Sequence, residues 1–213
     1  MRSKELFGLL FLAFLLIAFA GQAHGNLEVV NSHSYIGGSD WLHIVGEVEN
    51  RADHIFKSIK VVATFYDSSG KVIGTDFGYT DIDAALPGEK VPFTLATDEI
   101  RNYEKYKLQV QGRPASSLRN QRKDIEVLSS QSYVESGYFH VVGEVENALS
   151  KPVKNVKIVV TIYDSENQDR GVDFAYTELD TIPPDSISPF DTGIENRGSF
   201  DRYKLQKEFR IMG

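Results

Sequence analysis

From Leu27 onward, apolar and polar positions alternate along the chain in short stretches. The clearest stretch covers residues 42–49, where Leu42, Ile44, Gly46 and Val48 alternate with His43, Val45, Glu47 and Glu49. A period of two residues predicts a β-strand with one face buried and the other in water. The first strand is therefore expected to place Leu42, Ile44 and Val48 inside and His43, Glu47 and Glu49 outside.

Further strands and turns follow in the same half of the chain. Residues 59–66 alternate again and are rich in β-branched side chains, and residues 72–80, 91–95 and 106–110 have the same character. The stretches 67–70 (DSSG) and 86–89 (LPGE) carry the Asp, Ser, Pro and Gly residues that form tight turns. We therefore expect a series of short antiparallel strands without helices.

The whole pattern occurs twice. His43 to Asn50 reads HIVGEVEN, and His140 to Asn147 reads HVVGEVEN, 97 residues later. At this shift residues 41–109 align with 138–206 without a gap, and about 27 of the 69 positions are identical. Upstream the match needs a shift of 98, which places one extra residue of the first copy in the turn at 36–40. The chain therefore contains a duplicated module.

Six or seven short strands in each copy predict an all-β fold of two tandem immunoglobulin-like antiparallel β-sandwiches after an N-terminal signal helix. The expected divisions are a signal peptide at 1–25, the first sandwich at 26–111, an exposed linker at 112–124 and the second sandwich at 125–213. Gly46 and Gly143 fall on the buried faces, where glycine indicates a bulge or a close approach by a backbone or a large ring. The expected core comprises Leu42, Ile44, Val48, Ile59, Val61 and Phe65 in the first copy and Phe139, Val141, Val145, Val156, Ile158 and Ile162 in the second.

The first 25 residues have the features of a secretory signal peptide. Arg2 and Lys4 precede an apolar run from Leu6 to Ala20, and small residues allow cleavage after Ala23 or Gly25. The alternative is an uncleaved anchor, but 15 helical residues rise only about 22 Å, whereas the hydrocarbon core is about 30 Å thick. We expect an extracytoplasmic protein, secreted or associated with the cell envelope.

Composition narrows the function further. The chain has no cysteine, which excludes disulfides, thiolate metal sites, a cysteine nucleophile and a lipobox. Its net charge is -7, and removal of residues 1–25 leaves 21 basic and 29 acidic residues, a charge of -8. An acidic chain repels phosphate backbones, so nucleic acid is not expected as a partner.

Several short motifs resemble the FxLYD family. They are Gly46-Glu47-Val48-Glu49-Asn50, the strand that ends in Tyr66-Asp67 and the turn Leu86-Pro87-Gly88-Glu89, with Gly143–Asn147 and Tyr163-Asp164 in the second copy. In the motif itself, Ala63 and Val160 stand in place of Phe, and Phe65 and Ile162 in place of Leu. The resemblance implies extracytoplasmic immunoglobulin-like modules of envelope proteins, mostly without assigned activity.

The repeated octet is the first candidate for chemistry. His43, Glu47 and Glu49, with His140, Glu144 and Glu146 in the second copy, are the residue types that bind divalent ions. Residues four apart on a strand are about 13 Å apart, too far for one ion, so only Glu47 with Glu49, or neighbours across the sheet, fit a metal. Lys60 and Lys157 suggest instead a solvated face with cross-strand charge pairs.

Two further groups have both a functional and a structural interpretation. Asp76, Asp81 and Asp83, with Asp173, Glu178 and Asp180, suggest either a calcium-binding loop or acidic residues that form local turn hydrogen bonds. An outward strip along one predicted strand of each copy suggests either a docking surface for a protein or glycan, or packing under a loop. The strip comprises Val62, Thr64 and Tyr66 in the first copy and Val159, Thr161 and Tyr163 in the second.

No nucleophile elbow, phosphate loop or histidine pattern of a hydrolase is present in the sequence. We therefore assign no catalytic, cofactor-binding or metal-binding residue, expect no cofactor and predict that the chain is not an enzyme. The predicted function is binding or scaffolding in the cell envelope through protein contacts, with unidentified envelope proteins as partners and membrane contact only through the N-terminal segment if it is not cleaved. The alternative is a metal-ion- or carbohydrate-binding module, and a hydrolase is third.

Overall fold

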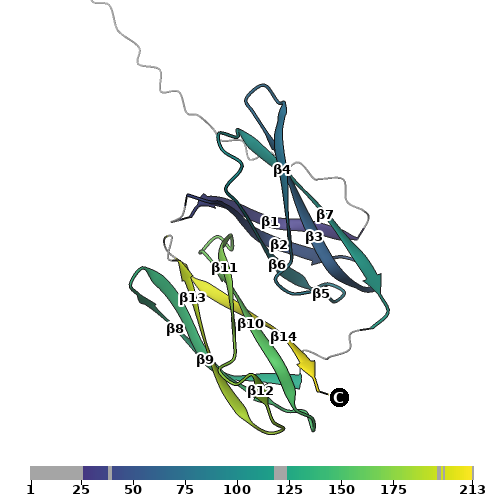
Figure 1. Cartoon of the computed structure of the whole chain (residues 1–213), viewed down its shortest axis with the longest axis vertical. Helices are drawn as coiled ribbons and strands as arrows, with labels where there is room; N and C mark the ends of the chain where they lie inside the picture. The colour runs from purple at the N-terminus through teal and green to yellow at the C-terminus, as the bar shows by residue number, and fades with distance from the viewer. Residues whose placement is uncertain (1–25, 38–39, 118–123, 196–197, 199, 213) are drawn as a thin grey trace, which may run out of the picture.

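The computed structural model describes residues 26–37, 40–117, 124–195, 198 and 200–212, which form two β-modules, one above the other in Figure 1. The signal segment at 1–25 lies outside the described residues. The first module contains β1 (Leu27–Ile36), β2 (Leu42–Asn50), β3 (Ile55–Tyr66), β4 (Val72–Tyr79), β5 (Ala84–Ala85), β6 (Lys90–Thr97) and β7 (Lys105–Ala115). The second contains β8 (Ile125–Glu135), β9 (Tyr138–Asn147), β10 (Val153–Tyr163), β11 (Asp169–Tyr176), β12 (Thr181–Ile182), β13 (Ile187–Glu195) and β14 (Arg202–Ile211).

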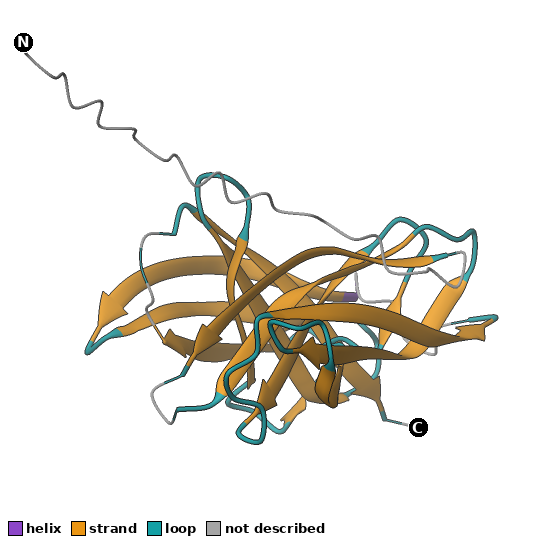
Figure 2. Cartoon of the chain, turned by 90° about the horizontal axis from the view of Figure 1, so that it is seen from above, coloured by secondary structure: helices purple, strands orange, loops and turns teal. Residues whose placement is uncertain are grey.

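Each module is a sandwich of two antiparallel sheets. In the first module, β1, β2 and β6 form one sheet, and β3 carries β4, β5 and β7 in the other. The second module repeats this arrangement with β8-β9-β13 and with β10 carrying β11, β12 and β14. Strands make up nearly all of the regular structure in Figure 2. The predicted all-β fold of two tandem sandwiches is therefore confirmed.

The core of each module is the predicted one. All twelve residues expected inside are buried, from Leu42 to Phe65 in the first module and from Phe139 to Ile162 in the second. Gly46 pairs with Ser32, next to an irregularity in the β1 register at Val29/Asn31, and a Cβ atom on Gly46 would come within 2.7 Å of the Phe93 ring and collide with the Asn31 carbonyl oxygen. Gly143 is confined in the same way by Phe190 and Ser129. Both glycines are thus required by close approach, as expected.

Asn50, the last residue of the octet, is a buried connector between the sheets. Its side-chain amide donates hydrogen bonds to the carbonyl oxygens of His54, at 2.8 Å, and Ala85, at 2.9 Å. Its side-chain oxygen accepts a hydrogen bond from the Ala52 amide at 3.0 Å. Asn147 makes the same three contacts in the second module, with Lys151, Ile182 and Leu149. The repeated Asn therefore holds the corner of each sandwich as well as ending a strand.

Two sequence predictions about the fold are wrong. β7 continues to Ala115 and pairs with Ile55, so the first four residues of the predicted linker at 112–124 belong to a sheet. Lys60 and Lys157 were expected on strands adjacent to the octet, but β3 and β10 lie in the opposite sheets from β2 and β9. The Lys60 ammonium instead lies 3.5 Å from the centroid of the Phe77 ring. Across the described ranges, no helix is long and apolar enough to cross a membrane.

Candidate functional site

The two modules contact each other through the outer faces of two different sheets. We call the outer surface of β1-β2-β6, centred on Val45 and Glu47, the β2 face, and the outer surface of β11-β10-β14, centred on Val159, Thr161 and Tyr163, the β10 face. β11 lies against β1, β2 and β6, and Figure 1 shows it between the modules. The contact therefore joins segments that lie far apart in the sequence.

An apolar centre holds the junction together. Val45 of the β2 face is fully buried, although it points away from the core of its own sandwich. Val159 and Val172 of the second module are buried in the same cluster as the core of the first module. Removal of this apolar surface from water stabilises the docked arrangement, at roughly 25 cal/mol per Å².

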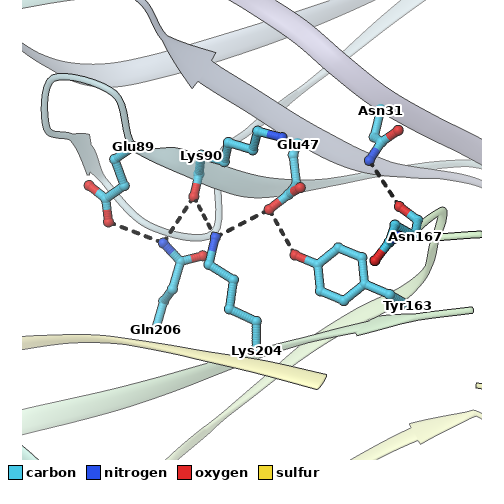
Figure 3. Close-up of polar contacts among 8 residues, drawn as sticks. All are labelled: Asn31, Glu47, Glu89, Lys90, Tyr163, Asn167, Lys204 and Gln206. Atoms are coloured by element: carbon cyan, nitrogen blue, oxygen red, sulfur yellow. Dashed lines mark hydrogen bonds and ion pairs between the residues drawn. The ribbon is translucent and has the colours of Figure 1, made fainter. Parts of the chain in front are cut away.

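Glu47 is the polar centre of the junction. Its side chain is 2% exposed, and it accepts a hydrogen bond from the Tyr163 hydroxyl at 2.8 Å and one from the Lys204 ammonium at 3.3 Å (Figure 3). Burial and the neighbouring Glu47 carboxylate raise the pKa of Tyr163, so its hydroxyl remains a donor at neutral pH. The prediction that Glu47 faces water is wrong, because the second module covers it.

Backbone carbonyls of the β2 face accept further hydrogen bonds from the β10 face. The Lys204 ammonium and the Gln206 side-chain amide both donate to the Lys90 carbonyl oxygen, at 2.9 and 3.1 Å. The Gln206 amide also donates to the Glu89 carboxylate at 3.1 Å. Figure 3 shows these contacts beside Glu47. Because the Lys90 acceptor is a main-chain oxygen, its two hydrogen bonds depend little on the side chain at position 90, whereas the third depends on the Glu89 carboxylate.

Contacts at the two ends of the junction fix its register. At one end the Asn31 amide donates to the Asn167 carbonyl oxygen at 3.3 Å (Figure 3). At the other end the Lys157 ammonium donates to the Asp81 carbonyl oxygen at 2.7 Å, and the Asp83 backbone amide donates to the Glu208 carboxylate at 2.7 Å. The polar contacts thus extend along the whole length of the two faces.

Among the described residues, three side chains of the junction have buried oxygens without a hydrogen-bond partner: Thr161, Gln206 and Asp169. Asp169 is the ionisable group among them. Its side chain is buried, with 1% exposed, and neither carboxylate oxygen makes a hydrogen bond within the described structure. Burial, and then the nearby Glu47, raise the pKa of Asp169 to about 7, although the cations of Lys204, Lys90 and Arg202 oppose the shift. Neither a motif nor the alternation of the sequence pointed to Asp169, and its one signal was that the matching position of the first copy holds Val72.

The corresponding faces of the other two sheets lie on the surface. The β9 face, centred on Val142 and Glu144, matches the β2 face, and Glu144 is exposed where Glu47 is buried. The β3 face, centred on Val62, Thr64 and Tyr66, matches the β10 face and is half-buried where that face is fully buried. The predicted outward strip is therefore a docking surface within the chain in its second copy.

The remaining candidate residues make local contacts. His43 stacks on Tyr35 and His140 on Tyr133, with ring centroids 5.0 and 4.9 Å apart, and His140 also lies 3.1 Å from an Asp191 carboxylate oxygen. Glu49 pairs with Arg51 at 2.8 Å.

The acidic groups predicted as a calcium alternative are also engaged locally. Asp76 and Asp173 accept hydrogen bonds from the amides of the next residues, and Asp81 accepts one from Thr94 at 3.2 Å. Burial raises the pKa of Asp81 to about 6, against the effect of Lys157. The described residues hold no group of three or more His, Asp or Glu side chains placed to share one metal ion.

No family model matches the chain. No curated protein matches it either. Among solved structures, a beta-glucuronidase from glycoside hydrolase family 2 is 11% identical, covering 80% of this chain and 23% of that enzyme with a TM-score of 0.30. Red sea bream transglutaminase is also 11% identical, covering 86% of this chain and 29% of that enzyme with a TM-score of 0.29. The chain spans about a quarter of the length of these enzymes, and likenesses this weak carry no functional argument.

Proposed function

We propose that the chain is an exported, noncatalytic protein of the cell envelope that binds or scaffolds other proteins through the outer faces of its sheets. The observation that supports this most is the junction itself. There, two sheet faces bind each other through apolar side chains and a row of hydrogen bonds, with Glu47 at the centre. Because each face has a counterpart on the surface, the chain presents two more surfaces of the same kind.

Export and the envelope location rest on the sequence. The N-terminal segment has the charge and apolar run of a signal peptide, and the two modules resemble FxLYD modules of extracytoplasmic proteins. The duplicated octet contributes to that resemblance through Gly46 and Asn50, which have structural roles in the first sandwich, as Gly143 and Asn147 do in the second. These residues therefore support a structural module more directly than an active site.

The alternative, a module that binds a metal ion or a carbohydrate, has less support. The two octet acids of the first copy have different surroundings and partners, since Glu47 is buried in the junction and Glu49 pairs with Arg51. The exposed aromatic rings of Phe77 and Tyr79 meet edge to face at 89°, and the Lys60 ammonium covers the first ring. A flat stacking platform for a sugar ring is not formed there.

Site-specific photocrosslinking tests the proposal. A photoreactive residue at Glu144, on the β9 face, or at Gln109, on the edge of the β3 face, should give protein adducts in envelope fractions. The same residue at exposed Lys151, in the turn after β9, is the matched control. Adducts at the two face positions and none at Lys151 would support protein binding. Equal labelling at all three positions, or none, would contradict it.

A further inference from the structure

The two modules are copies of one sequence, yet they meet through different faces. The β2 face of the first module contacts the β10 face of the second, so the interface is heterologous: the two surfaces that meet are not the same patch. A heterologous contact between repeated units leaves one unused copy of each surface. In this chain those copies are the β9 face of the second module and the β3 face of the first.

The unused faces keep the groups that make the centre of the junction. Glu144 corresponds to Glu47, Tyr66 to Tyr163, Lys107 to Lys204 and Gln109 to Gln206. The strand registers agree, since Tyr66 pairs with Lys105 and Thr64 with Lys107, as Tyr163 pairs with Arg202 and Thr161 with Lys204. Two of the three apolar residues at the centre are also kept, with Val142 for Val45 and Val62 for Val159, while Thr75 stands in place of Val172.

The ends of the junction are conserved in kind as well. On the unused faces, Ser129 stands in place of the donor Asn31, and the carbonyl oxygen of Gly70 stands in place of that of Asn167. Lys60 stands in place of the donor Lys157, and the carbonyl oxygen of Glu178 stands in place of that of Asp81.

Two further replacements keep an acceptor in place. Gln111 replaces Glu208 and retains a side-chain oxygen that can accept from the backbone amide of Asp180. Ser186 replaces Glu89 and retains an oxygen for Gln109. Each hydrogen bond described in the junction therefore has a donor and an acceptor on the unused faces.

One pair of positions changes together. In the junction the Lys90 ammonium acts on the buried Asp169 carboxylate and opposes the rise of its pKa. The matching residues on the unused faces are Ile187, on β13, and Val72, on β4. Both are apolar and lie on the surface, with 47% and 49% exposed. The charged pair Lys90 and Asp169 of the junction thus corresponds to the apolar pair Ile187 and Val72. A contact between the unused faces would bury this apolar pair without the cost of burying a carboxylate.

We propose that the β9 face of one copy of this chain binds the β3 face of a second copy, repeating head to tail the junction that joins its own two modules. This rests on the proposed function and names the partner as the chain itself. Each added copy again presents one β9 face and one β3 face, so the assembly grows as a row of modules unless its rotation closes a ring.

Sedimentation equilibrium of the purified chain tests this. The weight-average mass should rise with concentration over about 1 μM to about 1 mM, the range of weak protein contacts. Glu144→Lys or Lys107→Glu should each weaken association by about tenfold or more, because two like charges replace an ion pair at a covered position. Asp98→Lys and Lys151→Glu make the same charge changes at exposed positions outside both faces and should leave association unchanged.

A mixture of the two defective chains gives the sharper result. The Lys107→Glu chain has an intact β9 face, and the Glu144→Lys chain has an intact β3 face. Mixed together they should therefore associate more tightly than either variant does alone. A two-fold symmetric contact would use only one of the two faces, so one of the variants would associate alone. An exchange of modules between chains would use the β2 and β10 faces, so both variants would associate alone.

A wild-type chain that stays a single copy up to about 1 mM would overturn the proposal, as would either variant associating like the wild type. In that case, adducts of another protein at Glu144 or Gln109 would leave the proposed function standing with a different partner. Absence of both self-association and adducts would remove the two together. Thermal unfolding of each variant checks that it is folded, since Glu144 and Lys107 are exposed.

Discussion

Strands β2 and β9 carry nearly the same eight residues, and their outer faces lie in two different environments. Glu47 is 2% exposed and binds Tyr163 and Lys204, whereas Glu144 is exposed. The backbone, the core side chains and the strand registers correspond closely. The difference arises only from what covers each face, so the same sequence motif can form either a buried contact or an open surface. Changes at matched positions in the two modules separate what the motif does for the fold from what it does for docking.

The largest effect is expected where the two octets behave alike. Asn50→Ala should destabilise the first module by about 3 kcal/mol, because it leaves two carbonyl oxygens and one amide of the sandwich corner without their partner. Asn147→Ala should cost the second module about the same. Urea unfolding measures both. Asn31→Ala, which removes one exposed hydrogen bond, is the control and should change stability by less than about 1 kcal/mol.

A large difference between Asn50→Ala and Asn147→Ala would contradict the view that the two residues have the same role. It would mean that the docked second module supports the corner of the first, or the reverse. Similar losses would place the role of Asn within each sandwich.

The next effect is a pH dependence of the free energy of unfolding, which arises in the covered junction. The pKa of Asp169 is about 7 in the folded chain and about 4 in an unfolded one. The folded state therefore binds this proton more tightly, and its contribution to stability grows as the pH falls from above 7 toward 4. Between about pH 8 and about pH 5 the gain should be about 2.5 kcal/mol. Asp81, with a pKa of about 6, acts in the same direction.

Asp169→Asn isolates the contribution of the buried carboxylate. Near pH 8 the variant should be more stable than the wild type. It should show little of the increase in stability that the wild type gains between pH 8 and pH 5. Val72→Asn, at the matching position on the exposed β3 face, should leave the pH dependence of unfolding unchanged. A wild-type and an Asp169→Asn chain with parallel stability profiles between pH 5 and 8 would contradict the pKa assigned to Asp169.

The third effect compares the octet acids directly. Glu47→Ala should destabilise the chain by about 1.5 kcal/mol, because Tyr163 and Lys204 lose their acceptor while Asp169 is relieved of a nearby negative charge. Glu144→Ala should lie within about 0.5 kcal/mol of the wild type in dilute solution, as surface changes usually do. Chemical unfolding at neutral pH measures the pair. Equal losses would show that Glu47 contributes to its own sandwich and not to docking.

The sequence allowed the sandwiches and their cores to be predicted, because alternation reports which side of a strand faces its own module. Leu42, Ile44 and Gly46 followed from that rule alone. The same rule failed for Val45 and Glu47, since nothing in a strand's period tells whether another module covers its outer face. Lys60 was misplaced because sheet membership depends on non-local pairing. Asp169 could have been noticed only by comparing the copies, where an acid stands against Val72.

The smallest effect connects the junction to self-association. Tyr163→Phe should destabilise the chain by about 1 kcal/mol, since it removes the hydroxyl that donates to buried Glu47 at 2.8 Å and keeps the ring. Tyr66→Phe, at the same position of the β3 face, should leave unfolding in dilute solution unchanged, because the Tyr66 side chain is half-exposed. At high concentration the order should reverse for association: Tyr66→Phe should weaken it, because Tyr66 would then donate to Glu144 of a second copy, and Tyr163→Phe should not. If Tyr66→Phe were neutral at both concentrations, the hydroxyl would have no role outside the chain, and the resemblance of the β3 face to the β10 face would reflect only their common origin.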